Sequence, residues 1–149
     1  MIKALNLREK TSLLHANYIG KLTYSEHNQT FITPITYFYN QEKNNITCHL
    51  YNRDKINALR KKKSVSLSVS DVNSFDQYES VLVKGTYKEH SGSGAKAILH
   101  QFSFGIKQLI LNEEQKHLDF MNQFSNKIYV NDIPVIFTIE IAEITGKSR

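Results

Sequence analysis

The sequence has few of the residues that cross-link a small protein or interrupt its helices and strands. It holds one cysteine, Cys48, which excludes an internal disulfide. It also has only two prolines, six glycines and no tryptophan. Few loops therefore need special backbone angles, and we expect long strands and helices. We expect one domain over residues 1–149, because a chain of this length can bury about 70% of its unfolded surface.

Long apolar runs are also missing. No run approaches the roughly 18 apolar residues that a membrane-spanning helix needs, and the first ten residues lack the apolar stretch of a secretion signal. We therefore expect a cytoplasmic protein that does not contact a membrane. The net charge is +5, and the basic residues are spread along the chain apart from the run at 60–63. That pattern favours a solvated helix end over a nucleic-acid interface.

The motifs of common metal and nucleotide sites are absent as well. Six histidines are present, but none has a spacing typical of zinc, so we expect no metal site. No phosphate-binding loop or Gly-x-Gly-x-x-Gly run occurs. The Ser-Gly-Ser-Gly run at 91–94 is interpreted as a flexible turn.

Hydrophobic periodicity predicts a mainly β protein with α additions. Alternation and β-branched content indicate strands at 19–25, 30–39, 46–51, 64–70, 78–90 and 134–145. Helical spacing and capping residues indicate helices at 7–17, 54–62, 95–104 and 112–124. Residues 71–77 are expected to form a loop, and Pro34 to mark a sheet edge or a bulge. Five or six strands joined by short turns favour an antiparallel barrel with helices added to it.

Residues 30–63 carry the clearest chemical signal. A short polar loop connects the strand at 46–51 to a basic helix, and Arg53 and Lys55 lie at this junction. Cations beside a helix N-terminus, with its N–H groups and positive dipole end, are suited to a phosphorylated ligand. The alternative is that both cations are simply solvated. His49, just before the loop, is either ligand-facing or a histidine satisfied by backbone groups.

Five segments, taken in order, resemble one known family. They are Tyr-Ile-Gly-Lys-Leu at 18–22, Ile-Thr-Pro-Ile-Thr-Tyr at 32–37, Cys-His-Leu at 48–50 with the helix that starts near Lys55, Ser-Val-Leu-Val-Lys-Gly-Thr-Tyr at 80–87, and the closing strand at 137–146. Together they resemble the pyridoxamine 5′-phosphate oxidase-like, flavin-binding split-barrel proteins, in the branch of nitroimidazole-resistance-type proteins. The resemblance implies a six-stranded antiparallel split β-barrel with peripheral helices, forming a homodimer with FMN at the subunit interface.

The resemblance also implies a set of cofactor-binding residues. The flavin ring would be lined, largely through backbone, by Thr33, Pro34, Ile35 and Thr36. The ring and ribityl chain would be flanked by His49, Leu50 and Tyr51, and the phosphate would be held by Arg53 and Lys55. The set is completed by Tyr78, where the family often has a tryptophan, and Ser80.

Besides Tyr78, other residues depart from the family pattern, and the glycine that usually precedes the basic pair is replaced within Asn52-Arg53. Leu50 replaces a hydroxyl side chain that would donate to the phosphate. Asp54 places a carboxylate near the same group unless it points away, and it could instead be the helix N-cap.

The function expected from this resemblance is that of an FMN-dependent oxidoreductase whose small-molecule substrate is not identified. In such enzymes the flavin carries the hydride or electron chemistry. One alternative is a non-catalytic split-barrel dimer that has lost flavin or binds it without turnover. A third is a haem-handling split barrel, with His49, His90 or His100 as axial ligand.

Overall fold

The computed structural model describes residues 2–112 and 135–149. The elements follow in the order β1 (Lys3–Ala4), α1 (Leu7–Ala16), β2 (Ile19–Glu26), β3 (Gln29–Asn40), β4 (Asn45–Leu50), α2 (Arg53–Lys61), β5 (Ser64–Ser74), β6 (Gln77–His90), α3 (Gly92–Asn112) and β7 (Val135–Ser148). Among these residues, no helix combines the length and the apolar character needed to cross a membrane.

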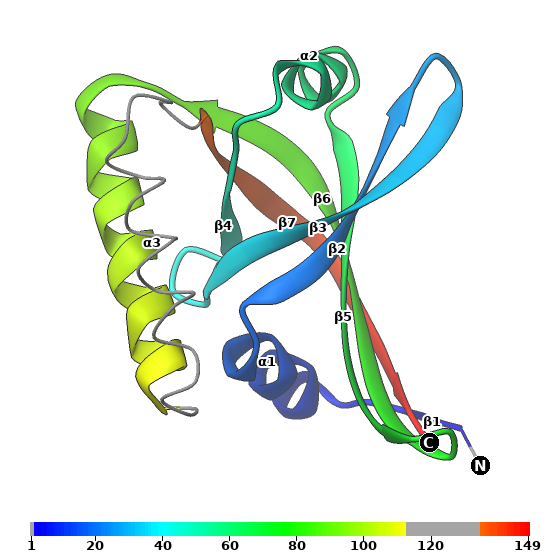
Figure 1. The fold of residues 1–149 in the computed structure, drawn as a ribbon. Coiled ribbons are helices and arrows are strands. Elements are labelled where there is room, and N and C mark those ends of the chain that lie inside the picture. Colours follow the sequence, from blue (N-terminus) through cyan, green and yellow to red (C-terminus); the bar gives the residue numbers. More distant parts are fainter. Residues whose placement is uncertain (1, 113–134) are drawn as a thin grey trace.

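The strands form one antiparallel sheet that closes on itself. Its order is β1-β7-β4-β3-β2-β5-β6, and β6 pairs back onto β7 (Figure 1). The six long strands therefore make a ring, which confirms the expected six-stranded antiparallel architecture. The two-residue β1, which the sequence pattern did not predict, pairs with the end of β7.

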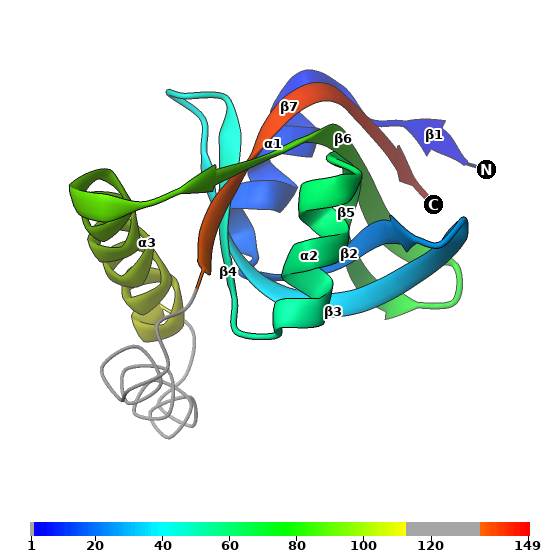
Figure 2. The same cartoon turned by 90° about the horizontal axis from the view of Figure 1, so that it is seen from above.

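Two short helices close the ends of this ring. In two perpendicular views, α2 lies across one end and α1 near the other (Figures 1 and 2). The first turn of α1 carries a capping box, in which Asn6 and Glu9 bond each other's backbone. Leu14 of α1 and Leu59 of α2 are fully buried in the same apolar cluster as the inward side chains of the strands. One core thus fills the ring from end to end.

The third helix lies outside the ring. α3 buries Phe102, Ile106 and Ile110 in a second apolar cluster with Tyr18, and Phe38 of β3 packs against it. Because the core covers one face of β4 and α3 lies over the other, four successive residues from Asn45 are buried. The helix is longer than the predicted 95–104 and begins at Gly92, whose φ is 67°. The expected flexible turn at 91–94 is therefore wrong, and the helix predicted at 112–124 lies outside the described residues.

The β5–β6 hairpin is also longer than expected. The strands run to Ser74 and start again at Gln77, so only Phe75 and Asp76 form the turn, and the loop predicted at 71–77 is wrong. Asp, Asn and Ser are poor strand formers alone, but cross-strand pairing overrides that preference here. Pro34 lies in the half of β3 that pairs with β2 alone, which confirms the predicted edge position.

Candidate functional site

The predicted site lies where β3 and β4 separate. Their pairing ends at Tyr37 and Cys48; beyond that point β3 continues beside β2, while β4 leads into α2. The first turn of α2 returns to β3 at this place. The Nζ of Lys55 donates a hydrogen bond to the Oγ1 of Thr33 at 2.9 Å. The structure therefore brings together two of the predicted residues, one from each side of the gap.

Alternation along β3 decides which side chains can face a ligand there. Thr33 and Ile35 are buried, and Ile35 belongs to the ring's core. Pro34 is exposed and Thr36 is half-buried, on the opposite face of the strand. Ile32, on the same outer face, has 65% of its surface exposed. This part of β3 offers an apolar outer surface, to which Ile35 can contribute only backbone atoms.

Side chains at the end of β4 also alternate between the outer face and the core. The ring centroid of His49 lies 5.6 Å from that of Tyr51 and 5.1 Å from that of Phe102 on α3, both in edge-on contact. His49 therefore sits between α3 and the β4–α2 junction. Leu50 instead packs against the core of the ring. Its side chain points away from the outer surface where the resemblance would put the flavin.

The N-terminus of α2 is capped by its own chain. The Oδ1 of Asn52 accepts hydrogen bonds from the N–H groups of Asp54 at 3.0 Å and Lys55 at 3.2 Å. The alternative that Asp54 is the cap is therefore wrong; Asp54 is exposed in the first turn. Because Asn52 occupies two of the N–H groups, a phosphate here depends on side-chain cations unless it displaces this carboxamide.

The two predicted phosphate cations point in different directions. Residues two apart on a helix lie about 200° apart around its axis. Lys55 faces β3, whereas Arg53 lines a pocket of about 400 Å³ on the other side of α2. That pocket is also lined by Tyr51, Ile56, Asn57, Arg60 and Val135. Of the two predicted phosphate cations, only Lys55 faces β3 in this structure.

Tyr78 and Ser80 lie at the opposite end of the molecule from α2. Tyr78 exchanges both main-chain hydrogen bonds with Arg149, and Ser80 accepts a bond from the hydroxyl of Ser70 at 3.2 Å. The other end of β6 is anchored to α2 through Glu89, which Arg60 contacts at 2.7 and 2.9 Å. Along an extended strand, Tyr78 and Glu89 are about 35 Å apart. Within one chain, Tyr78 and Ser80 therefore do not join the residues around Lys55.

The histidines considered as haem ligands are spread over three elements. His49 and His90 are cross-strand neighbours of Ile136, one on each side of β7, so they lie about 10 Å apart. The Nε2 of His90 is 3.0 Å from the Oγ1 of Thr138. His100 is exposed on α3. In the part of the chain that the structure describes, no group of three or more His, Cys, Asp or Glu side chains is placed to hold a metal ion.

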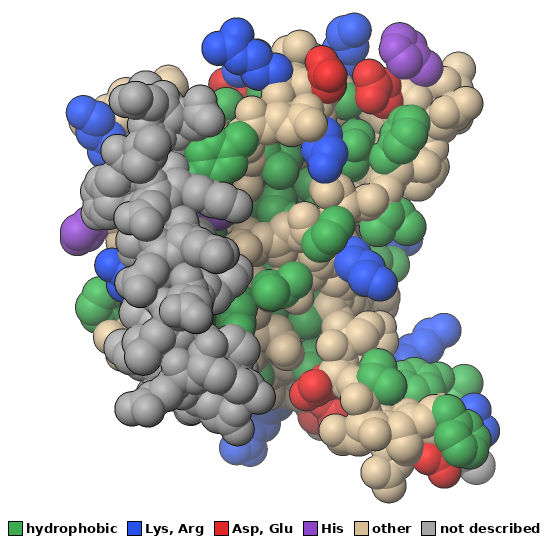
Figure 3. Space-filling view, in the orientation of Figure 1, with side chains coloured by type: hydrophobic (Ala, Val, Ile, Leu, Met, Phe, Trp, Pro, Cys, Tyr) green, Lys and Arg blue, Asp and Glu red, His purple; other side chains and the backbone are tan. Residues whose placement is uncertain are grey.

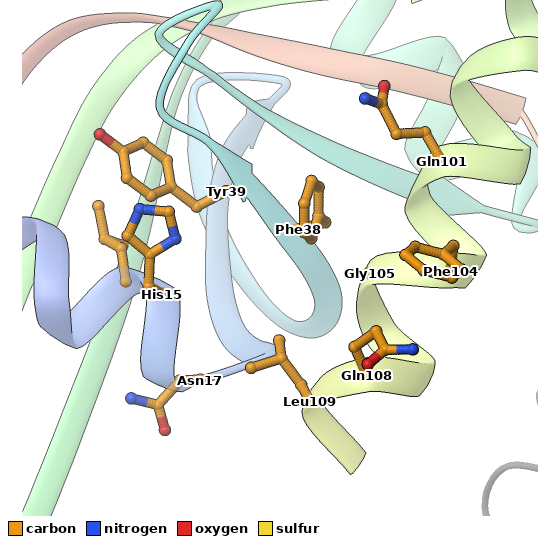
Figure 4. Close-up of a pocket in the computed structure, with 10 residues that line it drawn as sticks. His15, Asn17, Phe38, Tyr39, Gln101, Phe104, Gly105, Gln108 and Leu109 are labelled. Carbon is orange, nitrogen blue, oxygen red and sulfur yellow. The ribbon is translucent and has the colours of Figure 1, made fainter. Parts of the chain in front are cut away.

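A separate pocket of about 390 Å³ opens between α1, β3 and α3. Figure 4 shows Phe38 and Tyr39 on one side of it and Phe104 and Leu109 on the other. The remaining lining residues are Leu14, His15, Asn17, Gln101, Gly105 and Gln108. This pocket contains none of the site residues predicted from the sequence, and its walls are mainly apolar.

A closed ring of six antiparallel strands that separates between β3 and β4, with helices outside it, defines a split-barrel protein. The family described as pyridoxamine 5′-phosphate oxidase matches residues 7–148, and the chain belongs to this family. No curated protein matches the sequence.

Solved structures resemble the chain over its whole length. An FAD-binding protein from Mesorhizobium loti is 20% identical with a TM-score of 0.76, over 100% of this chain and 99% of that one. The FAD and heme binding protein from Mycobacterium smegmatis is 14% identical with a TM-score of 0.71, over 98% and 73%. A putative 5-nitroimidazole antibiotic resistance protein from Bacteroides thetaiotaomicron is 12% identical with a TM-score of 0.67, over 99% and 89%. At these identities the likeness establishes the fold.

Proposed function

We propose that this protein binds FMN as a homodimer, with the phosphate beside Lys55 and the flavin ring along the outer surface of β3. The observation that carries the proposal is the Lys55–Thr33 contact across the gap between β3 and α2. It sets a cation at Thr33, in the half of β3 that contains Pro34. Membership of the family and the likeness to proteins described as FAD-binding support a flavin as the ligand.

The chemistry of the donors fits an anionic group. The ammonium of Lys55 has three N–H donors, of which one is directed at Thr33. The others remain for a phosphate, and a hydrogen bond to a charged partner contributes roughly 1.5–3 kcal/mol. Ile32 and Pro34 supply apolar contacts for a flat ring on the adjacent outer surface. With Leu50 turned inward, the phosphate is held by charge rather than by a hydroxyl donor from that position.

Bound flavin would supply hydride or electron transfer, and the chain would position it. We therefore propose a flavin-dependent oxidoreductase acting on a small molecule. His49, on the outer face of β4 near the junction, is our candidate for proton transfer. The family's motif positions at Tyr78 and Ser80 would be contributed by the second subunit, because they lie too far from Lys55 in one chain.

Exposed apolar residues at the β5–β6 hairpin support a dimer. Val72 and Phe75 have 66% and 86% of their surface exposed. Hydrophobic side chains gather at this end of the molecule, at the lower right of Figure 3. Contiguous exposed apolar surface of this kind is typical of an interface. A second copy docked here would carry its hairpin tip, with Tyr78 and Ser80, toward the β3 surface of its partner.

FMN titration of three proteins tests the phosphate position. Lys55→Glu should weaken FMN binding at least tenfold, because loss of one charged hydrogen bond is worth about 1.4 kcal/mol or more. Lys63→Glu, exposed beyond the far end of α2, makes the same change in net charge and should leave the affinity within about twofold. Equal losses in both variants would show that only overall charge matters.

FAD and hemin titrated in parallel identify a different cofactor if either binds more tightly than FMN.

A non-catalytic flavin carrier is the second candidate. It is favoured by the Asn52 cap and by the outward turn of Arg53, which leave one cation at the proposed phosphate position. Flavin that stays oxidised under anaerobic conditions with NADH or NADPH would support this carrier. Bleaching of the flavin absorbance by either nucleotide would support the oxidoreductase.

A further inference from the structure

A third pocket, which we call the outer-face pocket, lies on the outer side of the ring near the start of α3. Its volume is about 360 Å³, within the range of small-molecule sites. None of the residues assigned to the flavin site lines it. The residues that do are Asn40, Lys43, Asn45, Thr47, Lys88, His90, Ile98, Gln101, Thr138 and Glu140.

The sheet register explains why the floor of this pocket is polar. Thr138 of β7 is directly opposite Thr47 on β4 and Lys88 on β6. In the next row toward the β3–β4 turn, Glu140 is opposite Asn45. Residues directly opposite one another share a face of a sheet. Three strands therefore place these five polar side chains next to one another on the outer face, where apolar residues would be expected beneath a covering helix.

The residues of this floor have little exposed surface. Thr138, Thr47 and Asn45 have 2%, 5% and 8% of their surface exposed. The Oγ1 of Thr138 donates to Glu140 at 3.4 Å and lies 3.0 Å from the Nε2 of His90. Within residues 2–112 and 135–149, the side chains of Thr47 and Asn45 make no hydrogen bond, although both line the pocket. Their polar atoms are not among the buried unpaired atoms of the described residues, so they are accessible from the pocket and can bond a ligand that enters it.

The charges around the pocket define the ligand further. Lys43 and Lys88 are positive and Glu140 is negative, which leaves one net positive charge among them. Burial, followed by the two lysines, lowers the pKa of His90 against the opposing effect of Glu140. His90 is therefore neutral at pH 7 and acts as a hydrogen-bonding group. A singly charged carboxylate balances the net positive charge of Lys43, Lys88 and Glu140, whereas a phosphate dianion would be repelled by Glu140.

We propose that the outer-face pocket binds a small amino or hydroxy carboxylic acid. Its carboxylate pairs with Lys43 and Lys88, and its ammonium or hydroxyl group donates to Glu140. The remaining polar atoms bond the side chains of Thr47 and Asn45. The site is separate from the proposed flavin position, so its occupancy does not require bound flavin.

Titration of the ¹⁵N-labelled full chain with D-gluconate and L-glutamine tests this assignment. Saturable amide shifts are expected at residues 43–47, 88–90 and 138–140 with at least one probe, at up to about 10 mM. Lys88→Gln should weaken that binding at least fivefold, and Lys84→Gln, exposed on the same strand outside the pocket, should not. Glu140→Gln should weaken L-glutamine more than D-gluconate, because it removes the acceptor for an ammonium group.

Three results would overturn the proposal. The first is the absence of a saturable shift with either probe. The second is an equal effect of Lys84→Gln and Lys88→Gln, which would show general charge screening. The third is that inorganic phosphate produces the same shifts at equal concentration. Amide dispersion of each variant, recorded before the titration, establishes that it is folded, and Lys43→Gln in the exposed β3–β4 turn replaces Lys88→Gln if that variant is not.

Discussion

At the scale of single residues, Gly85 shows how closely β6 and β7 approach. A Cβ added there would lie 2.3 Å from the backbone oxygen of Glu140 and 2.8 Å from the Cγ2 of Ile139. This position coincides with the register shift between the two strands. Because the nearest atom belongs to backbone, a side chain can be accommodated only by moving a strand of the ring.

Gly85→Ala should lower the free energy of unfolding by about 1–3 kcal/mol, the usual cost of overpacking. Gly94→Ala is the matched control: nothing lies within 4 Å of its Cβ position, and it is inside α3. It should raise stability by up to about 1 kcal/mol through helix propensity. Urea denaturation of both variants measures the difference. Equal stabilities would show that β6 can shift without cost and that the close approach is unimportant.

At the same scale, the sequence predicts part of the candidate site but not all of it. The cationic junction could be read from residue types, and Lys55 does lie beside the Pro34-containing strand. That Arg53 points away from Lys55 could not be read from residue types, because it depends on the residue at which the helix starts. With Asn52 as the cap, Arg53 and Lys55 fall on different sides of α2. Asparagine is a common cap, but Asp54 was an equally good candidate from the sequence alone.

At the scale of elements, a polar network attaches α2 to β6. Arg60 donates to both carboxylate oxygens of Glu89, and the hydroxyl of Tyr87 donates to one of them at 2.7 Å. The hydrogen bond from Arg60 is the largest cause of a lowered pKa for Glu89, to which Tyr87 also contributes. Burial and the same carboxylate raise the pKa of Tyr87.

This network predicts a pH dependence of stability. A carboxylate with a lowered folded-state pKa stabilises the fold above its ordinary pKa, and this contribution is lost as the pH falls through the folded value. Wild type should therefore be more stable than Glu89→Gln at pH 7, and the difference should shrink as the pH falls below 4.5. Thermal unfolding from pH 7 downward measures it, with Glu79→Gln on the same strand as control for the lost charge. A difference that does not change with pH would rule out the ion pair as its source.

Elements with strong alternation of polar and apolar residues could be predicted from the sequence. Segments that form only because another strand or the core packs against them could not. The serine-aliphatic run from Ser64 predicted β5 correctly up to Ser70. Its continuation through Asp71 to Ser74 has little strand propensity and exists because β6 pairs with it. Likewise, α3 extends through Gly92 and Gly94, whose propensity opposes a helix, because its apolar face packs on Tyr18 and Phe38.

At the scale of the whole molecule, the predicted site residues lie in two distant places within one chain. Lys55 and the tip of the β5–β6 hairpin are held at opposite ends of the ring by the anchoring of α2 on β6. The sequence predicted both groups of residues and the family resemblance joined them, but the register of β6 shows that they cannot meet within one chain. The proposed homodimer resolves this separation.

Light scattering of the purified protein should give twice the chain mass of 17.2 kDa. Val72→Glu should shift the mass toward 17.2 kDa and weaken FMN binding together, because it buries a charge at the proposed interface. Phe104→Glu, an equally exposed apolar position on α3, should leave both unchanged. A monomeric wild type that still binds FMN would contradict the shared site.

The central claim is that Lys55 holds the phosphate of a flavin at the gap between β3 and α2. Riboflavin, which lacks that phosphate, tests it most directly when titrated beside FMN against wild type and Lys55→Glu. The account predicts that wild type binds FMN at least tenfold more tightly than riboflavin, and that Lys55→Glu abolishes this difference while leaving riboflavin affinity unchanged. Equal affinities for the two flavins in wild type, or an undiminished preference for FMN in Lys55→Glu, would contradict it.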